Sequence, residues 1–207
     1  MSASCHIRRS VIAAAAVALF AQPVAAQDPS ASVQKLLERG ALNEAVQRAE
    51  GERDNPESTY LAGQAFAKMD NGDRAGQEFN RLRETGDESW KAIGEAAALA
   101  LAGNTAGAMD AANRAVAANS GNPYAHYQLG LMASRQNNFA RALTAFERAI
   151  ELKPDFAYAH YYAGLASQRL KQTAKMSAHL ESFMNLAPEA PERAAVSAIL
   201  RTLRGRR

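Results

Sequence analysis

The sequence predicts an all-α protein made of helix–turn–helix repeats of about 34 residues that end in a C-terminal capping helix. The composition, with 47% hydrophobic and 22% charged residues, is that of a globular protein. Alanine is abundant and long runs of β-branched residues are missing, which favours helix. Finally, residues 123–156 align with residues 157–190 as two successive copies of the repeat. These observations predict stacked helical hairpins.

Residues 1–26 are predicted to be a secretory signal peptide. Two arginines and no acid occupy the first nine residues, an apolar run covers 11–21, and small residues precede the boundary between Ala26 and Gln27. The apolar run is shorter than the roughly 20 residues needed to span a bilayer. We therefore expect export to the periplasm or the medium, cleavage near Ala26, and no stable membrane span afterwards. An uncleaved anchor is the alternative.

The charge of the chain argues against nucleic acid as a partner. The net charge is +3, and loss of Arg8 and Arg9 with the signal would leave +1. Cys5, the only cysteine, would be lost as well. The mature chain is then expected to contain no disulfide and no thiolate metal ligand.

Four units in register cover residues 56–188, with approximate bounds 56–88, 89–122, 123–156 and 157–188. Each unit contains two amphipathic segments with apolar residues at helical spacing, joined by a polar turn such as Asn137-Asn138. Gly130 is expected to let the two helices of its hairpin approach closely. Equivalent positions recur along the chain: Gly63, Ala75 and Phe79; Ala96, Ala108 and Ala112; Gly130, Ala142 and Phe146; Gly164, Met176 and Leu180.

Residues 56–188 resemble a tetratricopeptide-repeat (TPR) protein. The third unit carries the family signature of a large residue followed by glycine, a small residue, an aromatic residue, a small residue and proline: Leu129-Gly130, Ala142, Phe146, Ala149 and Pro154. The resemblance implies a right-handed α-solenoid in which the first helix of each hairpin lines a concave groove. The alanine-rich unit 89–122 departs from the signature, with Ala96 in place of glycine and Ala112 in place of the aromatic residue.

Two segments flank the repeats. Residues 27–55 are predicted to form a degenerate N-terminal helical hairpin that is broken at Gly40. Residues 189–207 are predicted to form a capping helix, beginning at Pro191, and a basic tail. Terminal units of repeat arrays need a polar outer face, which the arginines of this segment supply.

One stripe of side chains is expected to line the groove and contact a partner. Tyrosine and arginine are favoured as interface anchors because they combine contact area with directed hydrogen bonds. Packing of the tyrosines between neighbouring repeats is the alternative. The lysine–asparagine pair that grips acidic chaperone tails in some TPR proteins is replaced here by Tyr127 and Leu131. The predicted groove residues are Tyr60, Trp90, Ile93, Tyr124, Tyr127, Leu131, Arg135, Tyr158, Tyr161, Leu165 and Arg169.

No catalytic or cofactor motif is present in the sequence. It contains no phosphate-binding glycine loop between strand and helix, no helix with paired histidines around a glutamate, and no Cys-x-x-Cys. His126 and His160 occupy equivalent positions one repeat apart and are interpreted as structural, while His179 is interpreted as isolated. We therefore expect no metal, no cofactor and no enzymatic activity.

The predicted function is a periplasmic scaffold or adaptor that binds a peptide or partner protein in its concave groove. The first alternative is an accessory subunit of an envelope assembly or secretion complex that docks through its convex face or its cap. A less favoured alternative is a cell-wall-associated enzyme with an unrecognised site.

Overall fold

The computed structural model describes residues 32–205, and the predicted signal peptide lies outside these residues. The described residues belong to one compact unit, 31–207. Within 32–205 the regular elements are all helices, which confirms the predicted all-α repeat fold. The helices are α1 Val33–Glu38, α2 Leu42–Gly51, α3 Pro56–Lys68, α4 Gly72–Thr85, α5 Glu88–Leu101, α6 Thr105–Ala118, α7 Pro123–Arg135, α8 Phe139–Leu152, α9 Ala157–Arg169, α10 Thr173–Leu186 and α11 Arg193–Arg204.

Recurring polar residues delimit the hairpins. Asparagine side chains cap successive helices by accepting a hydrogen bond from a free backbone N–H of the first turn. Residues of the α3–α4 and α7–α8 turns, Asp70 and Asn137, adopt a left-handed backbone conformation, with φ of 57° and 59°. Short polar residues adopt this conformation more easily than other residues with a side chain. The capping asparagines are Asn55, Asn71, Asn104, Asn122 and Asn138.

Glycine brings the two helices of a hairpin together. A Cβ atom placed on Gly130 would lie 2.6 Å from a ring carbon of Phe146, and one placed on Gly164 would lie 2.6 Å from Leu180. Phe146 and Leu180 are both fully buried. The close approach expected at Gly130 is therefore confirmed.

The alanine-rich unit packs differently. Ala96 and Ala112 stand where its neighbours have glycine and a large residue, and both are fully buried. The tight contact has moved to Gly94, where a Cβ would lie 2.6 Å from the carbonyl oxygen of Phe79. At Gly94, α5 thus packs tightly on α4 of the preceding unit.

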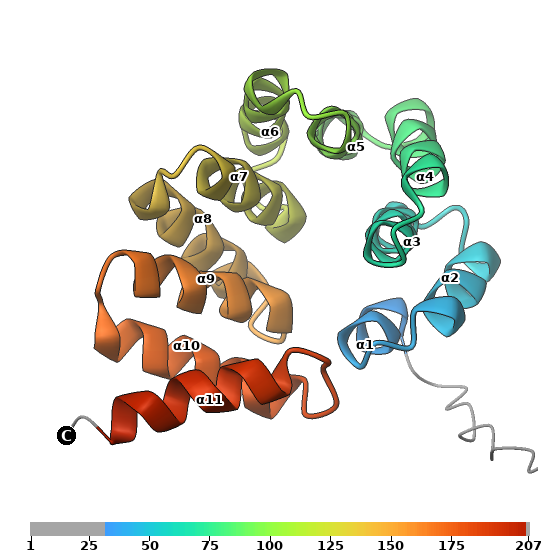
Figure 1. The fold of residues 1–207 in the computed structure, drawn as a ribbon. Coiled ribbons are helices and arrows are strands. Elements are labelled where there is room, and N and C mark those ends of the chain that lie inside the picture. The colour runs from blue at the N-terminus through green and yellow to red at the C-terminus, as the bar shows by residue number, and fades with distance from the viewer. Residues whose placement is uncertain (1–31, 206–207) are drawn as a thin grey trace, which may run out of the picture. The chain divides into compact units, whose positions relative to one another are not determined.

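The helices follow one another around a curve (Figure 1). α3, α5, α7 and α9 lie on its inner side, and α4, α6, α8 and α10 lie outside them. Neighbouring inner helices contact one another: α5 contacts α7, and α7 contacts α9. The first helix of each hairpin therefore lines the inner face, as the repeat register predicts.

The N-terminal hairpin contacts the C-terminal end of the array. Gln34 donates a hydrogen bond to the carbonyl oxygen of Asp155 at 3.1 Å, and a Cβ on Gly40 would lie 2.8 Å from Pro191 Cγ. α1 lies near the start of α11 in Figure 1. Val33, Leu36 and Leu37 of α1 are buried, and α1 also packs on α2 and α3.

The capping helix begins two residues later than expected, at Arg193 rather than Pro191. The residue before it, Glu192, accepts hydrogen bonds from Lys68 at 2.9 Å and from the Tyr158 hydroxyl at 3.1 Å. Burial alone would raise the pKa of Glu192, but the hydrogen bond and charge of Lys68 outweigh burial and lower it. The carboxylate therefore stays ionised and ties α3 to the C-terminal segment. No helix in 32–205 is long and apolar enough to span a bilayer.

Candidate functional site

Part of the predicted groove is filled by the chain's own aromatic side chains. Ring centroids lie 5.6 Å apart for Tyr60 and Tyr124, 5.4 Å for Trp90 and Tyr124, and 4.7 Å for Tyr127 and Phe156. Such distances are typical of favourable aromatic pairs. The rings come from α3, α5 and α7 and from the residue that precedes α9. They form an internal cluster across the inner face.

The buried members of the predicted groove pack against the chain itself, although Tyr60, Tyr127 and Tyr158 also line a small hollow of about 210 Å³. These side chains pack between repeats, which is the alternative that the sequence left open. The prediction that they lie on an open surface is wrong. The physical reason is the curvature, which brings the N-terminal halves of the inner helices into contact with one another and with α1. These buried residues are Tyr60, Ile93, Tyr124, Tyr127 and Tyr158, none of which is more than 6% exposed.

Hydrogen bonds hold the buried hydroxyls. The Tyr60 hydroxyl donates to Gln128 Oε1 at 2.9 Å, and the Tyr124 hydroxyl donates to Glu57 Oε1 at 2.6 Å. Burial raises the pKa of both tyrosines above its usual value, and the charge of Glu57 adds to this for Tyr124. Both hydroxyls therefore remain protonated donors and stabilise the cluster.

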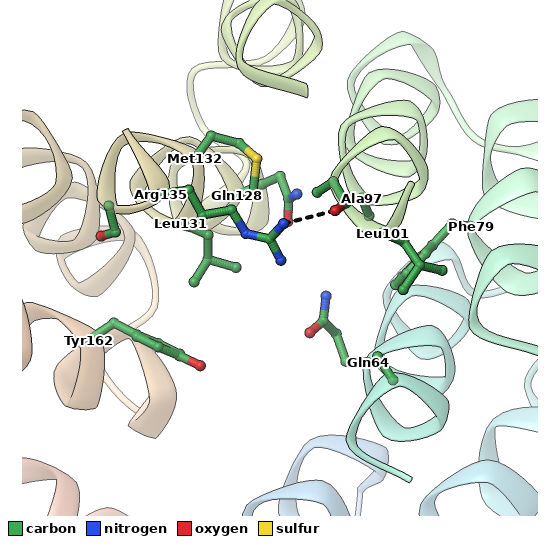
Figure 2. A pocket seen from close by; sticks show the side chains of 12 residues that line it. Gln64, Phe79, Ala97, Leu101, Gln128, Leu131, Met132, Arg135 and Tyr162 are labelled. Atoms are coloured by element: carbon green, nitrogen blue, oxygen red, sulfur yellow. Dashed lines mark hydrogen bonds between the residues drawn. The ribbon is translucent and has the colours of Figure 1, made fainter. Parts of the chain in front are cut away.

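An open hollow of about 370 Å³ lies at the other end of the inner face (Figure 2). It is walled by residues of α3, α4, α5, α7 and α9, and most of its surface is apolar. Leu101, on its wall, is the one large hydrophobic side chain among residues 32–205 that is strongly exposed, at 42%. The lining residues are Gln64, Ala67, Phe79, Ala97, Ala100, Leu101, Gln128, Leu131, Met132, Ser134, Arg135 and Tyr162.

Three polar side chains from different helices point into this hollow. Figure 2 shows the Arg135 guanidinium, the Gln64 amide and the Tyr162 hydroxyl directed toward the same space. Arg135 donates a hydrogen bond to the carbonyl oxygen of Ala100 at 2.8 Å, which fixes its position. None of the ion pairs found in the described part of the chain involves Arg135. Its positive charge is therefore presented to the hollow.

A second hollow of about 210 Å³ adjoins the first and shares Gln64, Ala67 and Tyr162 with it. Its lysine, Lys68, is held by Tyr158 and Glu192, so its charge is already neutralised. We call the two hollows together the inner groove. The inner groove is continuous, apolar on most of its walls, and positively charged at Arg135.

The remaining predicted residues divide into two groups. Leu131 and Arg135 line the inner groove, as expected. The other four are outside the two hollows: Trp90 joins the aromatic cluster, Tyr161 packs on Phe183, the Arg169 guanidinium lies over Phe139, and Leu165 is partly buried.

Several lining residues were not predicted, although a signal for them exists. Ala97 and Leu101 occupy the same repeat positions as Leu131 and Arg135, one unit earlier. Gln64 occupies the first of these positions in the unit before that. Extending the repeat register from the two correct residues to all inner helices would have identified this part of the groove.

A third hollow, of about 560 Å³, lies between α4, α5 and α6. It is larger than either hollow of the inner groove, but its walls are polar and four of its charged side chains are paired with one another. Lys91 bonds Glu88 at 2.9 Å and Arg114 bonds Glu95 at 2.8 Å. Paired surface charges offer a partner little binding energy, so we favour the inner groove despite its smaller volume.

His179 is not isolated, which corrects the interpretation from the sequence. Its Nδ1 lies 3.4 Å from Nδ1 of His160, and the two rings come from α10 and α9 of one hairpin. Burial lowers the pKa of both histidines. Within 32–205, no group of three or more histidine, cysteine, aspartate or glutamate side chains is placed to hold a metal ion.

The third unit decides which family of repeats this is. Residues 123–156 match a family model described as tetratricopeptide repeat. The chain contains a tetratricopeptide repeat. It is similar in fold to a chain of the APC/C hetero-tetramer Cut9–Hcn1, with a TM-score of 0.60, 17% identity, and coverage of 81% of this chain and 34% of that chain.

Two further solved structures are similar to the chain. The first TPR of Spaghetti (RPAP3), bound to an HSP90 peptide, has a TM-score of 0.53 and 19% identity over 57% of this chain and 91% of that chain. MamA has a TM-score of 0.47 and 19% identity over 74% of this chain and 93% of that chain. No curated protein sequence matches the chain. At these identities the likeness establishes the fold alone.

Proposed function

We propose that this TPR protein is an exported protein–protein interaction module that holds a segment of a partner protein in the inner groove. The observation that carries the proposal is the Arg135 guanidinium, fixed by Ala100 and directed into a hollow with apolar walls. An isolated cation beside an apolar surface favours a ligand that supplies both a carboxylate and apolar side chains.

The chemistry of the groove favours an extended peptide. The Gln64 amide lines the hollow between the apolar residues, and such a group binds the N–H and C=O groups of an extended backbone. Leu101 and Leu131 offer contact surface to its side chains. A fold of this kind has room for a peptide, since the Spaghetti TPR is described as bound to one.

The mode of binding should differ from the grip on acidic chaperone tails. The two positions that hold lysine and asparagine in that grip hold Tyr127 and Leu131 here, and Tyr127 is buried. A single acidic residue opposite Arg135, with apolar neighbours, is the partner motif we expect.

Docking through the outer hollow between α4, α5 and α6, or through the cap, remains the second candidate for an accessory role in an envelope complex. Its support is the exposed, highly charged surface of that hollow.

A photo-crosslinking amino acid distinguishes the two candidates. Placed at Leu101, on the rim of the inner groove, it should capture the partner in envelope extracts. Placed at Lys91, in the outer hollow, it should not. The opposite result would assign docking to the outer surface.

Truncation of groove residues should weaken partner binding while sparing the fold. Leu131→Ala is expected to cost about 1–2 kcal/mol of affinity, roughly 5- to 30-fold in Kd. Arg135→Ala should have an effect that shrinks in high salt, because an exposed charge pair is screened. Isothermal titration with the captured partner measures both.

Tyr124→Ala is the matched control for these variants. Because Tyr124 is buried and lines neither hollow, its truncation should lower the melting temperature and leave the Kd of the folded molecules unchanged. Weakened binding in Tyr124→Ala, with Leu131→Ala unaffected, would contradict the proposed groove.

Export is part of the proposal and rests on the order of charged, apolar and small residues in 1–26. The exported protein is expected to begin at Gln27. N-terminal sequencing of protein recovered from the periplasm or medium measures this. Recovery of the chain only from the cytoplasm, with its first residues intact, would contradict it.

A further inference from the structure

The histidine pair has an arrangement that packing alone does not require. In the third unit, His126 Nε2 lies 2.9 Å from the carbonyl oxygen of Ser120. One repeat later, His160 Nε2 lies 3.3 Å from the carbonyl oxygen of Pro154. In both units the histidine binds a carbonyl of the turn that precedes its helix, which fixes the inter-repeat turn. This shared contact accounts for the histidine at this repeat position, but not for His179.

The shared contact also determines the protonation of His160. A carbonyl oxygen can only accept a hydrogen bond, so Nε2 of His160 carries the hydrogen and Nδ1 carries a lone pair. His179 Nε2 lies 3.6 Å from the carboxylate of Glu147, which is longer than a hydrogen bond, but the negative charge favours the tautomer with the hydrogen on Nε2. That carboxylate also pairs with Lys175 at 2.8 Å. In this tautomer the Nδ1 of His179 carries a lone pair as well.

Two lone pairs thus face each other across 3.4 Å. Neutral rings in these tautomers cannot hydrogen-bond through the two Nδ1 atoms, and their lone pairs repel. A cation between them would remove the repulsion. With metal–nitrogen bonds of about 2.0–2.1 Å, an Nδ1–Nδ1 distance of 3.4 Å corresponds to an angle of about 110° at the metal, which is close to tetrahedral.

We propose that His160 and His179 bind one divalent transition-metal ion through their Nδ1 atoms. Glu147 and the carbonyl of Pro154 are positioning groups, since metal-binding histidines usually donate their other ring N–H to a carboxylate or carbonyl. The chain supplies two ligands and water supplies the rest. The His179 side chain is 16% exposed, so solvent reaches the pair. Two imidazoles favour Cu²⁺, Ni²⁺ or Zn²⁺ over Mg²⁺ and Ca²⁺, which prefer oxygen.

The preceding unit provides a natural comparison. Ala145 occupies the repeat position of His179 in that unit, which therefore has the first histidine without the second. His126 should contribute nothing to metal binding. None of the residues of the site lines either hollow of the inner groove.

Isothermal titration of the untagged, chelator-treated full chain with ZnCl₂ tests the proposal. One Zn²⁺ per chain should bind, and CuCl₂ should bind more tightly, while MgCl₂ should give no saturable signal. His160→Ala and His179→Gln should each weaken Zn²⁺ binding at least about 10-fold. Loss of a residue that only supports a metal ligand already costs about this much, and loss of the ligand itself should cost no less. His179→Gln keeps the polarity and approximate size of the side chain, and circular dichroism verifies that each variant is folded.

Two controls separate this site from others. The first control is His126→Ala, and the second is a double variant that carries Cys5→Ala and His6→Ala. Both should leave the Zn²⁺ affinity unchanged. Loss of binding in either control would place the ion elsewhere and overturn the proposal. Zn²⁺ binding that is equal in His179→Gln and the parent chain would overturn it too, as would a parent Kd weaker than about 1 mM.

Discussion

Phe146→Ala should lower the free energy of unfolding by about 3–5 kcal/mol, the range for loss of a fully buried aromatic side chain. Phe146 is fully buried, lies against Gly130, and has its ring centroid 5.9 Å from Tyr127 and 5.7 Å from Tyr162. Removing the ring leaves a cavity between α7, α8 and α9. Urea unfolding followed by circular dichroism measures the change.

Phe139→Ala, on the same helix, is the matched control. Phe139 begins α8, is only partly buried, and lies under the guanidinium of Arg169. Its removal should cost about 1 kcal/mol, because less apolar surface returns to water and the cation–π contact is partly exposed. Equal losses for the two variants would show that Phe146 is not at a packed contact between helices.

Gly130→Leu is the second substitution with a large expected effect. Even its Cβ would overlap the Phe146 ring, and the remaining atoms would force α7 and α8 apart. Overpacking of this kind costs about 1–3 kcal/mol or more. The same denaturant titration measures it, and a melting curve like that of the parent would contradict the packing of α7 on α8.

Gly76→Ala is the control for this substitution. Gly76 also lies inside a helix, but the nearest atom to its Cβ would be Leu101 Cδ2 at 3.8 Å, an ordinary contact. Alanine should raise the free energy of unfolding by about 0.5–1 kcal/mol through its helix propensity. The two glycines should therefore respond with opposite signs.

The repeat fold could be predicted because its determinants are local. Gly130 and Phe146 belong to the two helices of one hairpin, and Gly164 and Leu180 repeat the pair at the same spacing in the next. A spacing of this kind is visible in the sequence alone. The shift of the tight contact to Gly94 was not visible, since it depends on how α5 sits against the preceding unit.

The candidate site was predicted only in part. Leu131 and Arg135 follow from the repeat register, but the burial of Tyr60 and Tyr124 depends on the curvature of the whole inner face. Curvature results from small rotations between successive repeats, and sequence motifs do not predict the size of these rotations. The contact between His160 and His179 likewise depends on how α9 and α10 are rotated about their axes.

The contacts of α1 with the last repeat set the number of repeats. In most repeat arrays each unit contacts only its neighbours, so units can be added or lost at little cost. Here Gln34 reaches Asp155 and Lys68 reaches Glu192, although each pair is far apart in the sequence. Duplication of one repeat would move these pairs apart and break both hydrogen bonds. Selection on this chain should therefore act against the repeat duplication and deletion by which such arrays ordinarily evolve.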